Sequence, residues 1–193
     1  IASLGLAGQY AQVVGDTLRT QVAELWSDLV QTFRDPVAGK ARGAPSENSI
    51  SSMPAGLSMW AHELQGTLAA QASDYGRAAA ARMLAFEEGL QTGQIQRAIV
   101  AALNASAALN SLNEYELSLQ WLERALHLAR AKAWPVYLAN GLALMGENQR
   151  CLGRLEAARE SLQESFDILA AKPRGRGYTI VLKYLADLDL AQS

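Results

Sequence analysis

Apolar residues recur three or four positions apart along most of this chain, and each such run ends in a short polar or glycine-containing segment. This spacing is typical of α-helices, because it places the apolar side chains on one face. A long helix is predicted from Tyr10 to Phe33, and it ends at Asp35-Pro36 because a residue before proline is disfavoured in the helical region. Further helices are predicted over 57–71, 75–91, 95–112, 115–132, 135–151, 155–171 and 177–191. We therefore expect an all-α fold.

Local signals mark several of the predicted helix ends. Asn113 followed by Glu116 has the residue types of a capping box, in which the first side chain caps a helix N-terminus. Pro135 suits the first turn of a helix, where its missing N–H costs nothing. Gly153 suits the left-handed residue that ends a helix. Residues 37–54 lose the periodicity and are rich in Gly, Pro and Ser, so we predict a loop there.

A forty-residue repeat accompanies the helical pattern. One set of small residues occurs three times, as Gly66/Ala78/Ala85, Ser106/Ser118/Ala125 and Gly146/Ala158/Ser165. Two helices approach within about 8–10 Å where the side chains between them are short. A fixed period of this length predicts a solenoid, in which each helical hairpin buries its apolar face on its neighbours.

Composition narrows the class of protein further. The 193 residues are 50% hydrophobic and 19% charged, which suits a continuous core rather than a disordered chain. With a formal net charge of −2 and no dense Lys/Arg run, we expect no nucleic acid binding through this region. No run of apolar residues approaches the length of a membrane span, so we expect no membrane insertion. Cys151 is the single cysteine, which fits a reducing, cytoplasmic location.

The spacing of the small residues resembles that of the tetratricopeptide repeat, a family of right-handed solenoids built from helix-turn-helix units. The turns at 112–115 and 152–155 also resemble those between the helices of that family. The period here is 40, however, and Arg82, Leu122 and Leu162 stand where the family has a large aromatic residue. Repeats of this longer kind are similar to those of bacterial regulatory and signalling proteins. HEAT and armadillo arrays share the period and are the alternative.

On this resemblance the chain divides into three parts: a partial N-terminal repeat with a long helix (1–34), a loop insertion (35–56) and tetratricopeptide-like repeats (57–193). The repeats are predicted at about 57–94, 95–134, 135–175 and, incomplete, 176–193. Because the sequence starts at Ile1 and stops within a predicted helix, we interpret it as part of a longer protein.

The last predicted helix would leave an apolar face open. That face is formed by Tyr178, Val181, Leu182, Leu185, Ala186 and Leu188. Terminal repeats normally need a polar cap, and an exposed apolar patch marks an interaction site. We therefore expect a second copy of the chain to cover this face, and hence self-association.

No arrangement of residues in the sequence points to catalysis. His62 and His127 lie on different repeats and Cys151 has no spaced partner, so we predict no metal site. Phosphate-binding loops, dinucleotide fingerprints and nucleophile elbows are missing from the sequence. We therefore expect no enzyme activity, no catalytic residue and no cofactor, and we interpret both histidines as structural.

In the tetratricopeptide family the first helix of each unit lines a concave, partner-binding surface. Carried over to this chain, the resemblance implies a groove formed by Trp60, Glu63, Asn110, Asn140, Glu147, Arg150, Lys183 and Asp187, with Thr67, Leu103, Ala107 and Ile180 beside them. Amide and charged side chains of this kind can hold a peptide backbone or carboxylate.

The function implied by the resemblance is a protein-interaction or regulatory module of a bacterial signalling or transcription-regulating protein, with a protein or peptide partner in the groove. Two alternatives remain open. One is a ligand-sensing or dimerising arm that controls an output domain such as a diguanylate cyclase. The other is an assembly adaptor or chaperone-like peptide binder.

Overall fold

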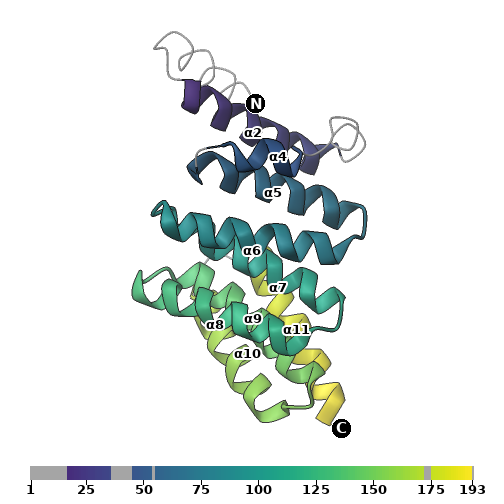
Figure 1. Ribbon diagram of the computed structural model, residues 1–193. Helices are drawn as coiled ribbons and strands as arrows, with labels where there is room; N and C mark the ends of the chain where they lie inside the picture. The colour runs from purple at the N-terminus through teal and green to yellow at the C-terminus, as the bar shows by residue number, and fades with distance from the viewer. Residues whose placement is uncertain (1–16, 36–44, 54, 172–174, 193) are drawn as a thin grey trace. The chain divides into compact units, whose positions relative to one another are not determined.

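The computed structural model describes residues 17–35, 45–53, 55–171 and 175–192. All regular secondary structure in these ranges is helical, which confirms the predicted all-α class (Figure 1). The helices are α2 (Thr17–Arg34), α4 (Glu47–Ser51), α5 (Ala55–Gln71), α6 (Tyr75–Gln91), α7 (Ile95–Ser111), α8 (Tyr115–Ala131), α9 (Pro135–Cys151), α10 (Leu155–Ala170) and α11 (Arg176–Gln192). They belong to two compact units, Ile1–Gln94 and Ile95–Ser193.

The predicted helix boundaries agree closely with the structure. Both ends of α6 and α9 are at the predicted residues, and each end of α5, α7, α8, α10 and α11 lies within two residues of its predicted position. The long N-terminal helix is present as α2, but its predicted start at Tyr10 lies outside the described residues. The division between the two units, after Gln94, coincides with a predicted boundary between repeats.

The prediction of a loop over 37–54 was wrong at the short helix α4. Ser46 caps this helix, because its hydroxyl accepts a hydrogen bond from the Ser49 N–H (3.2 Å). Ile50 is buried, at 3% exposed, and so anchors the helix. A helix of five residues is too short for apolar periodicity to reveal it. Residues 36–44 and 54 lie outside the described residues.

The turns between successive helices share one left-handed residue. Its φ angle is positive at Ser73 (61°), Gly93 (72°), Asn113 (61°), Ala133 (53°) and Gly153 (74°). After four of these residues the next N–H donates to the carbonyl five positions earlier, as from Glu114 to Leu109 (3.0 Å), which is the bond of a Schellman motif. The predicted roles of Gly153 at a helix end and of Pro135 in a first turn are confirmed.

Asn113 does not cap α8 as predicted. It takes the left-handed conformation that ends α7, and Glu114 occupies the N-cap position of α8 without a side-chain capping bond. Asparagine tolerates positive φ better than most residues, so this turn uses it to end one helix rather than to begin the next. Its side-chain oxygen accepts a hydrogen bond from the Tyr115 hydroxyl (2.7 Å).

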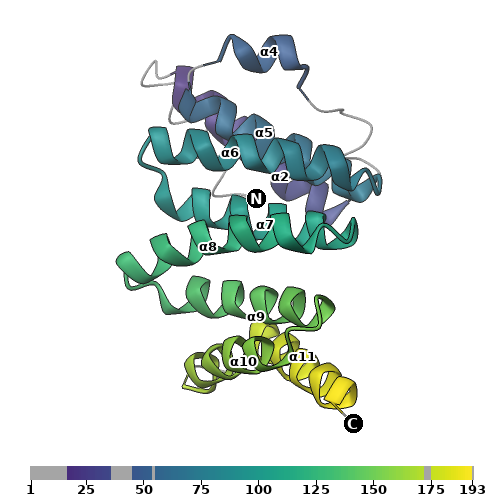
Figure 2. The same cartoon turned by 60° about the horizontal axis from the view of Figure 1, so that its bottom comes forward.

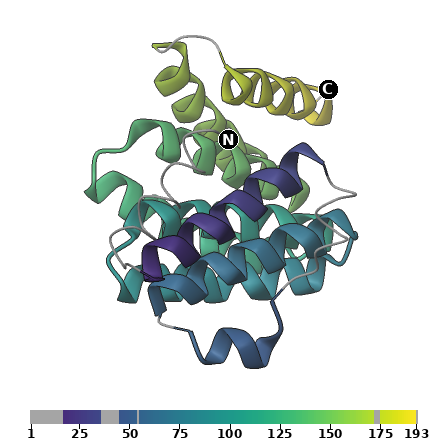
Figure 3. The same cartoon turned by 90° about the horizontal axis from the view of Figure 1, so that it is seen from above.

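In the N-terminal unit α5 is the central helix. It packs against α2, α4 and α6, and Figure 3 shows α2 running alongside it. Leu64 and Leu68 form a buried cluster on α5, and Leu25 of α2 and Trp60 of α5 pack against it. Leu25, which belongs to the apolar face that the sequence pattern predicts for this helix, therefore packs against α5.

The C-terminal unit stacks its helices in chain order. Each helix from α7 to α11 packs against the next one, and α9 also contacts both α7 and α11 (Figure 2). This nearest-neighbour packing of hairpins is that of a helical-repeat solenoid, as predicted. The core around α9, α10 and α11 contains Ala139, Ala143, Ala158, Leu162, Leu169, Val181 and Leu188.

The small residues of the forty-residue repeat are all buried, and the two glycines among them lie in close contact with the second helix of their hairpin. A Cβ atom placed on Gly146 would lie 2.5 Å from Leu162 Cγ and 3.1 Å from the Ala158 carbonyl oxygen, both on α10. A Cβ atom on Gly66 would lie 2.8 Å from Arg82 Cγ on α6. These glycines are therefore required by contact with the second helix of their own hairpin.

The predicted open apolar face of α11 is only partly open. Of its six predicted residues, Leu182 (42% exposed) and Ala186 are the most open to solvent. The other four are buried or partly buried in the core of the C-terminal unit: Tyr178, Val181, Leu185 and Leu188. The prediction was wrong for these four because α11 has two apolar stripes, and one of them faces the preceding hairpin.

We expect Gly146→Ala to lower the free energy of unfolding by about 1–3 kcal/mol, because the added methyl overpacks the contact with α10. Gly76→Ala is the matched control, since a Cβ atom there meets only Asp74 Oδ1, at 3.9 Å. That control should raise the stability by about 0.5–1 kcal/mol through helix propensity. Chemical denaturation followed by circular dichroism measures both. A gain at Gly146 equal to the gain at Gly76 would contradict the close contact.

We expect Ala133→Gly to raise the free energy of unfolding by about 0.5–1 kcal/mol. Relief of the left-handed strain, about 1–2 kcal/mol for a residue with a Cβ, exceeds the entropic cost of glycine. Ala171→Gly is the control, because Ala171 also follows a helix and is exposed but has φ −76°. Thermal unfolding of both variants should show opposite signs, and a loss at both positions would refute the strain argument.

Candidate functional site

Side chains from α9 and α11 form a polar cluster on the C-terminal unit. This α9–α11 cluster consists of Glu147, Arg150 and Cys151 from α9 and Lys183, Tyr184 and Asp187 from α11. The two helices pack against each other, and their charges interact. The cluster therefore brings together the four charged groove residues that the sequence predicted in this unit.

Arg150 and Glu147 form a bidentate ion pair one turn apart on α9. The Arg150 Nε and Nη2 atoms donate to the two Glu147 carboxylate oxygens at 2.8 and 2.9 Å. This hydrogen bonding raises the pKa of Arg150 above its usual range, against the opposing effect of desolvation. The side chains are 25% and 13% exposed, so the pair is partly shielded from solvent. Arg150 therefore keeps a fixed charge in a fixed orientation.

Lys183 and Asp187 form a second ion pair, on α11, with Nζ and Oδ2 at 2.6 Å. The hydrogen bond to Asp187 is the main cause that raises the pKa of Lys183, and Glu147 across the cluster also raises it. The Lys183 side chain is 65% exposed. Burial raises the pKa of Tyr184, as does the charge of Glu147, so its hydroxyl remains a neutral donor at physiological pH.

The two predicted asparagines each lie at a junction with the next first helix. A Cβ atom on Gly177, in the first turn of α11, would lie 2.8 Å from Asn140 Oδ1. Asn110 donates from Nδ2 to Asn148 Oδ1 of α9 at 2.5 Å. Asn140 is thus placed at the α9–α11 junction and Asn110 at the α7–α9 junction.

Through its hydrogen bond to Asn148, Asn110 is linked to a buried polar network that the sequence did not predict. The Asn148 amide donates to the Ser118 hydroxyl (2.5 Å), which lies 2.6 Å from the Ser106 hydroxyl. Asn148, Ser118 and Ser106 are all 0% exposed. The serines were recognised only as small residues. The available signal was Asn148 itself, a polar residue at a repeat position that is apolar forty residues before and after it, at Ala108 and Leu188.

The remaining predicted groove residues belong to the N-terminal unit. Trp60 packs beside the Leu64/Leu68 cluster, and Glu63 is buried, at 8% exposed. Arg82 is also buried, and desolvation lowers its pKa while the charge of Glu63 raises it. Glu63 therefore acts as the buried counter-charge of Arg82, which itself stands at the position that leucine fills in the other repeats.

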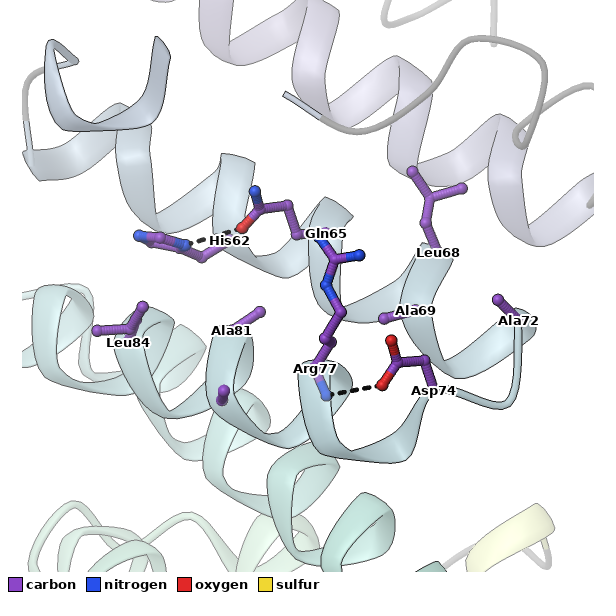
Figure 4. A pocket seen from close by; sticks show the side chains of 10 residues that line it. His62, Gln65, Leu68, Ala69, Ala72, Asp74, Arg77, Ala81 and Leu84 are labelled. Carbon is purple, nitrogen blue, oxygen red and sulfur yellow. Dashed lines mark hydrogen bonds between the residues drawn. The ribbon is translucent and has the colours of Figure 1, made fainter. Parts of the chain in front are cut away.

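A groove of about 330 Å³ lies between α5 and α6 in the N-terminal unit (Figure 4). Its apolar lining includes Leu68, Ala69, Ala72, Ala80, Ala81 and Leu84. His62 lies at one end, with Nδ1 3.2 Å from Gln65 Oε1 and Nε2 3.6 Å from Glu88 Oε1. Its neighbours and its burial favour the structural interpretation of this histidine.

The described part of the chain has no group of three or more His, Cys, Asp or Glu side chains placed to hold a metal ion. None of the helices in the described ranges is both long enough and apolar enough to cross a membrane. No protein-family model matches the chain, and no curated protein sequence matches it significantly.

We expect Ser118→Ala to lower the free energy of unfolding by about 1–3 kcal/mol, because it removes the acceptor of the fully buried Asn148 amide. The double variant Ser118→Ala/Asn148→Leu should recover part of this loss, since replacing both partners by apolar groups can be nearly neutral. Equilibrium denaturation of the two variants and the wild type measures the difference. Equal stabilities of the single variant and the wild type would contradict the network.

Proposed function

We propose that this chain is a tetratricopeptide-like interaction module of a cytoplasmic bacterial regulatory protein, and that the α9–α11 cluster holds an extended segment of a partner protein. The proposal is supported by the close-packed hairpins of the C-terminal unit, since a solenoid of this kind presents its first helices as a continuous surface. It is also supported by the resemblance of the small-residue spacing to the tetratricopeptide family.

The single observation that carries the proposal is the pairing of charges within the cluster. Two ion pairs lie on adjacent first helices, so donors and acceptors alternate across the junction. Glu147 and Cys151 engage only some of the five N–H donors of Arg150, and the exposed Lys183 ammonium has three. Backbone carbonyls and a carboxylate of an extended peptide are suitable acceptors for these groups.

The paired arrangement also explains why the surface suits binding rather than catalysis. Arg150 and Lys183 have pKa values raised by their carboxylate partners, so neither is poised to exchange protons near neutral pH. Fixed charges of both signs instead favour one orientation of a charged peptide and discriminate against others. The expected ligand is thus a peptide with at least one acidic group.

We expect this surface to select peptides from a random dodecapeptide library displayed on phage. The selected peptides, synthesised with a fluorescent label, should bind the wild type and lose about tenfold or more in affinity for the double variant Glu147→Gln/Arg150→Met, as measured by fluorescence polarisation. Removing both charges of the pair avoids leaving one ion uncompensated, so the variant should fold.

The matched control is the double variant Arg130→Met/Glu164→Gln. This removes an exposed ion pair of the same composition that joins α8 to α10, the second helices of their hairpins. Peptide affinity should be unchanged in the control. Selection of no peptide, or equal affinities for both double variants, would refute peptide binding at the α9–α11 cluster.

A further inference from the structure

Two alanines at equivalent repeat positions line the groove between α5 and α6. Ala69 lies on α5 and Ala81 lies on α6. In the α9–α10 hairpin the equivalent residues, eighty positions later, are Gln149 and Ser161, and the Ser161 hydroxyl donates to Gln149 Oε1 at 2.8 Å. These two repeat positions therefore contact each other across a hairpin when their side chains are long enough.

The α7–α8 hairpin carries large side chains at the same two positions. Leu109 stands forty residues after Ala69, and Trp121 stands forty residues after Ala81. Leu109 is 3% exposed and Trp121 is partly buried. The α5–α6 groove, of about 330 Å³, is therefore open at positions where the next hairpin has an isobutyl group and an indole ring.

Polar side chains border the apolar part of the α5–α6 groove. His62 and Gln65 interact with each other on α5, and Arg77 extends from α6 toward α5 (Figure 4). The backbone N–H of Arg77 donates to Asp74 Oδ1 at 3.1 Å. Its guanidinium forms no ion pair with any carboxylate in the described part of the chain. Arg77 thus brings five N–H donors and a positive charge to the edge of an apolar groove.

We propose that the α5–α6 groove binds an aromatic carboxylic acid, that is, a planar ring with a short chain that ends in a carboxylate. The ring packs on Ala69 and Ala81, in place of the side chains that the next hairpin supplies itself. The carboxylate accepts hydrogen bonds from the Arg77 guanidinium. The groove has the size of a small-ligand site, and an apolar lining with few polar groups is typical of such sites.

Charge complementarity favours an acid over an amine. A cationic ligand would meet the positive charge of Arg77 at the edge of the groove. Asp74 also lines the groove, but its carboxylate accepts from the N-terminus of α6 as the cap of that helix. The charge that remains to be matched by a ligand is therefore positive.

The first test is a titration of the whole chain with indole-3-acetate, followed by NMR. We expect saturable binding with a dissociation constant of about one millimolar or below, as suits a ligand of this size. The chain has two histidines, and the ring resonances of His62, in the groove, should shift while those of His127, on α8, should not. The variant His127→Gln assigns the two sets of resonances. Absence of saturable binding, or equal shifts at both histidines, would overturn the proposal.

The second test fills the groove with the side chain found in the next hairpin. Ala81→Trp should abolish the binding of indole-3-acetate, because its indole ring takes the ligand's place. Ala131→Trp is the matched control, at an exposed alanine of α8, and should bind as the wild type does. Circular dichroism checks that both variants are folded. Wild-type affinity in a folded Ala81→Trp variant would refute the site.

The third test separates the charge from the ring. Arg77→Met should weaken the binding of indole-3-acetate by roughly fivefold, because it removes the cation that meets the carboxylate. The affinity for neutral indole should stay unchanged in the same variant. Arg77 is exposed, so the substitution leaves the packing of the hairpin intact. An unchanged affinity for indole-3-acetate, or an equal loss for both compounds, would contradict recognition of the carboxylate.

This proposal does not depend on peptide binding by the α9–α11 cluster. The groove belongs to the N-terminal unit and the cluster to the C-terminal unit, and the two sets of experiments share no ligand and no variant. Binding of indole-3-acetate without selection of any peptide would favour the ligand-sensing alternative. Peptide binding without binding of indole-3-acetate would instead retain the interaction module and refute the small-molecule site.

Discussion

Close approach of two helices across one small residue is the contact on which the rest of this structure depends. At Gly146 there is no room for a Cβ atom, because Leu162 and the Ala158 carbonyl of α10 fill the space. With α10 held so closely against one side of α9, the other sides of α9 remain available for α7, α8 and α11. The polar cluster at the α9–α11 junction exists because of this division of one helix among several partners.

The turns set the length of each unit as firmly as the packing does. A left-handed residue every twenty positions, from Ser73 to Gly153, ends each helix at the same point of its hairpin. The next step falls on Pro173, which lies outside the described residues, and α11 begins at Arg176, one residue later than the step places it. The forty-residue spacing of core positions in the first helices is nevertheless kept. Gly141 and Val181 are forty residues apart, and both face the preceding hairpin.

Polar residues in this protein serve two different purposes. The Ser106–Ser118–Asn148 network is fully buried and joins three helices, so it fixes how the first two hairpins of the C-terminal unit stack. The α9–α11 cluster is partly solvated, and its ion pairs contribute little to stability where they are exposed. Fixed but accessible charge is useful for recognising a partner, and this contrast underlies the proposed binding role.

The sequence by itself determined the class of fold, the helix boundaries and the places where paired helices approach. These follow from local rules: apolar spacing, turn residues and the recurrence of small residues such as Gly146. It also placed the four charged residues of the α9–α11 cluster on first helices of neighbouring repeats, and their role in binding a partner stays a prediction. Local rules failed at Asn113, where two helix ends lie so close together that a residue suited to either can serve only one.

Only the tertiary structure decided which polar residues are buried and which are accessible. Glu63 and Lys183 occupy comparable places in the predicted groove, yet Glu63 is buried with Arg82 whereas Lys183 is largely exposed. The buried role of Asn148 and the two stripes of α11 emerged in the same way. Burial depends on which neighbouring helix covers a position, and that is a property of residues distant in the chain, which no local pattern contains.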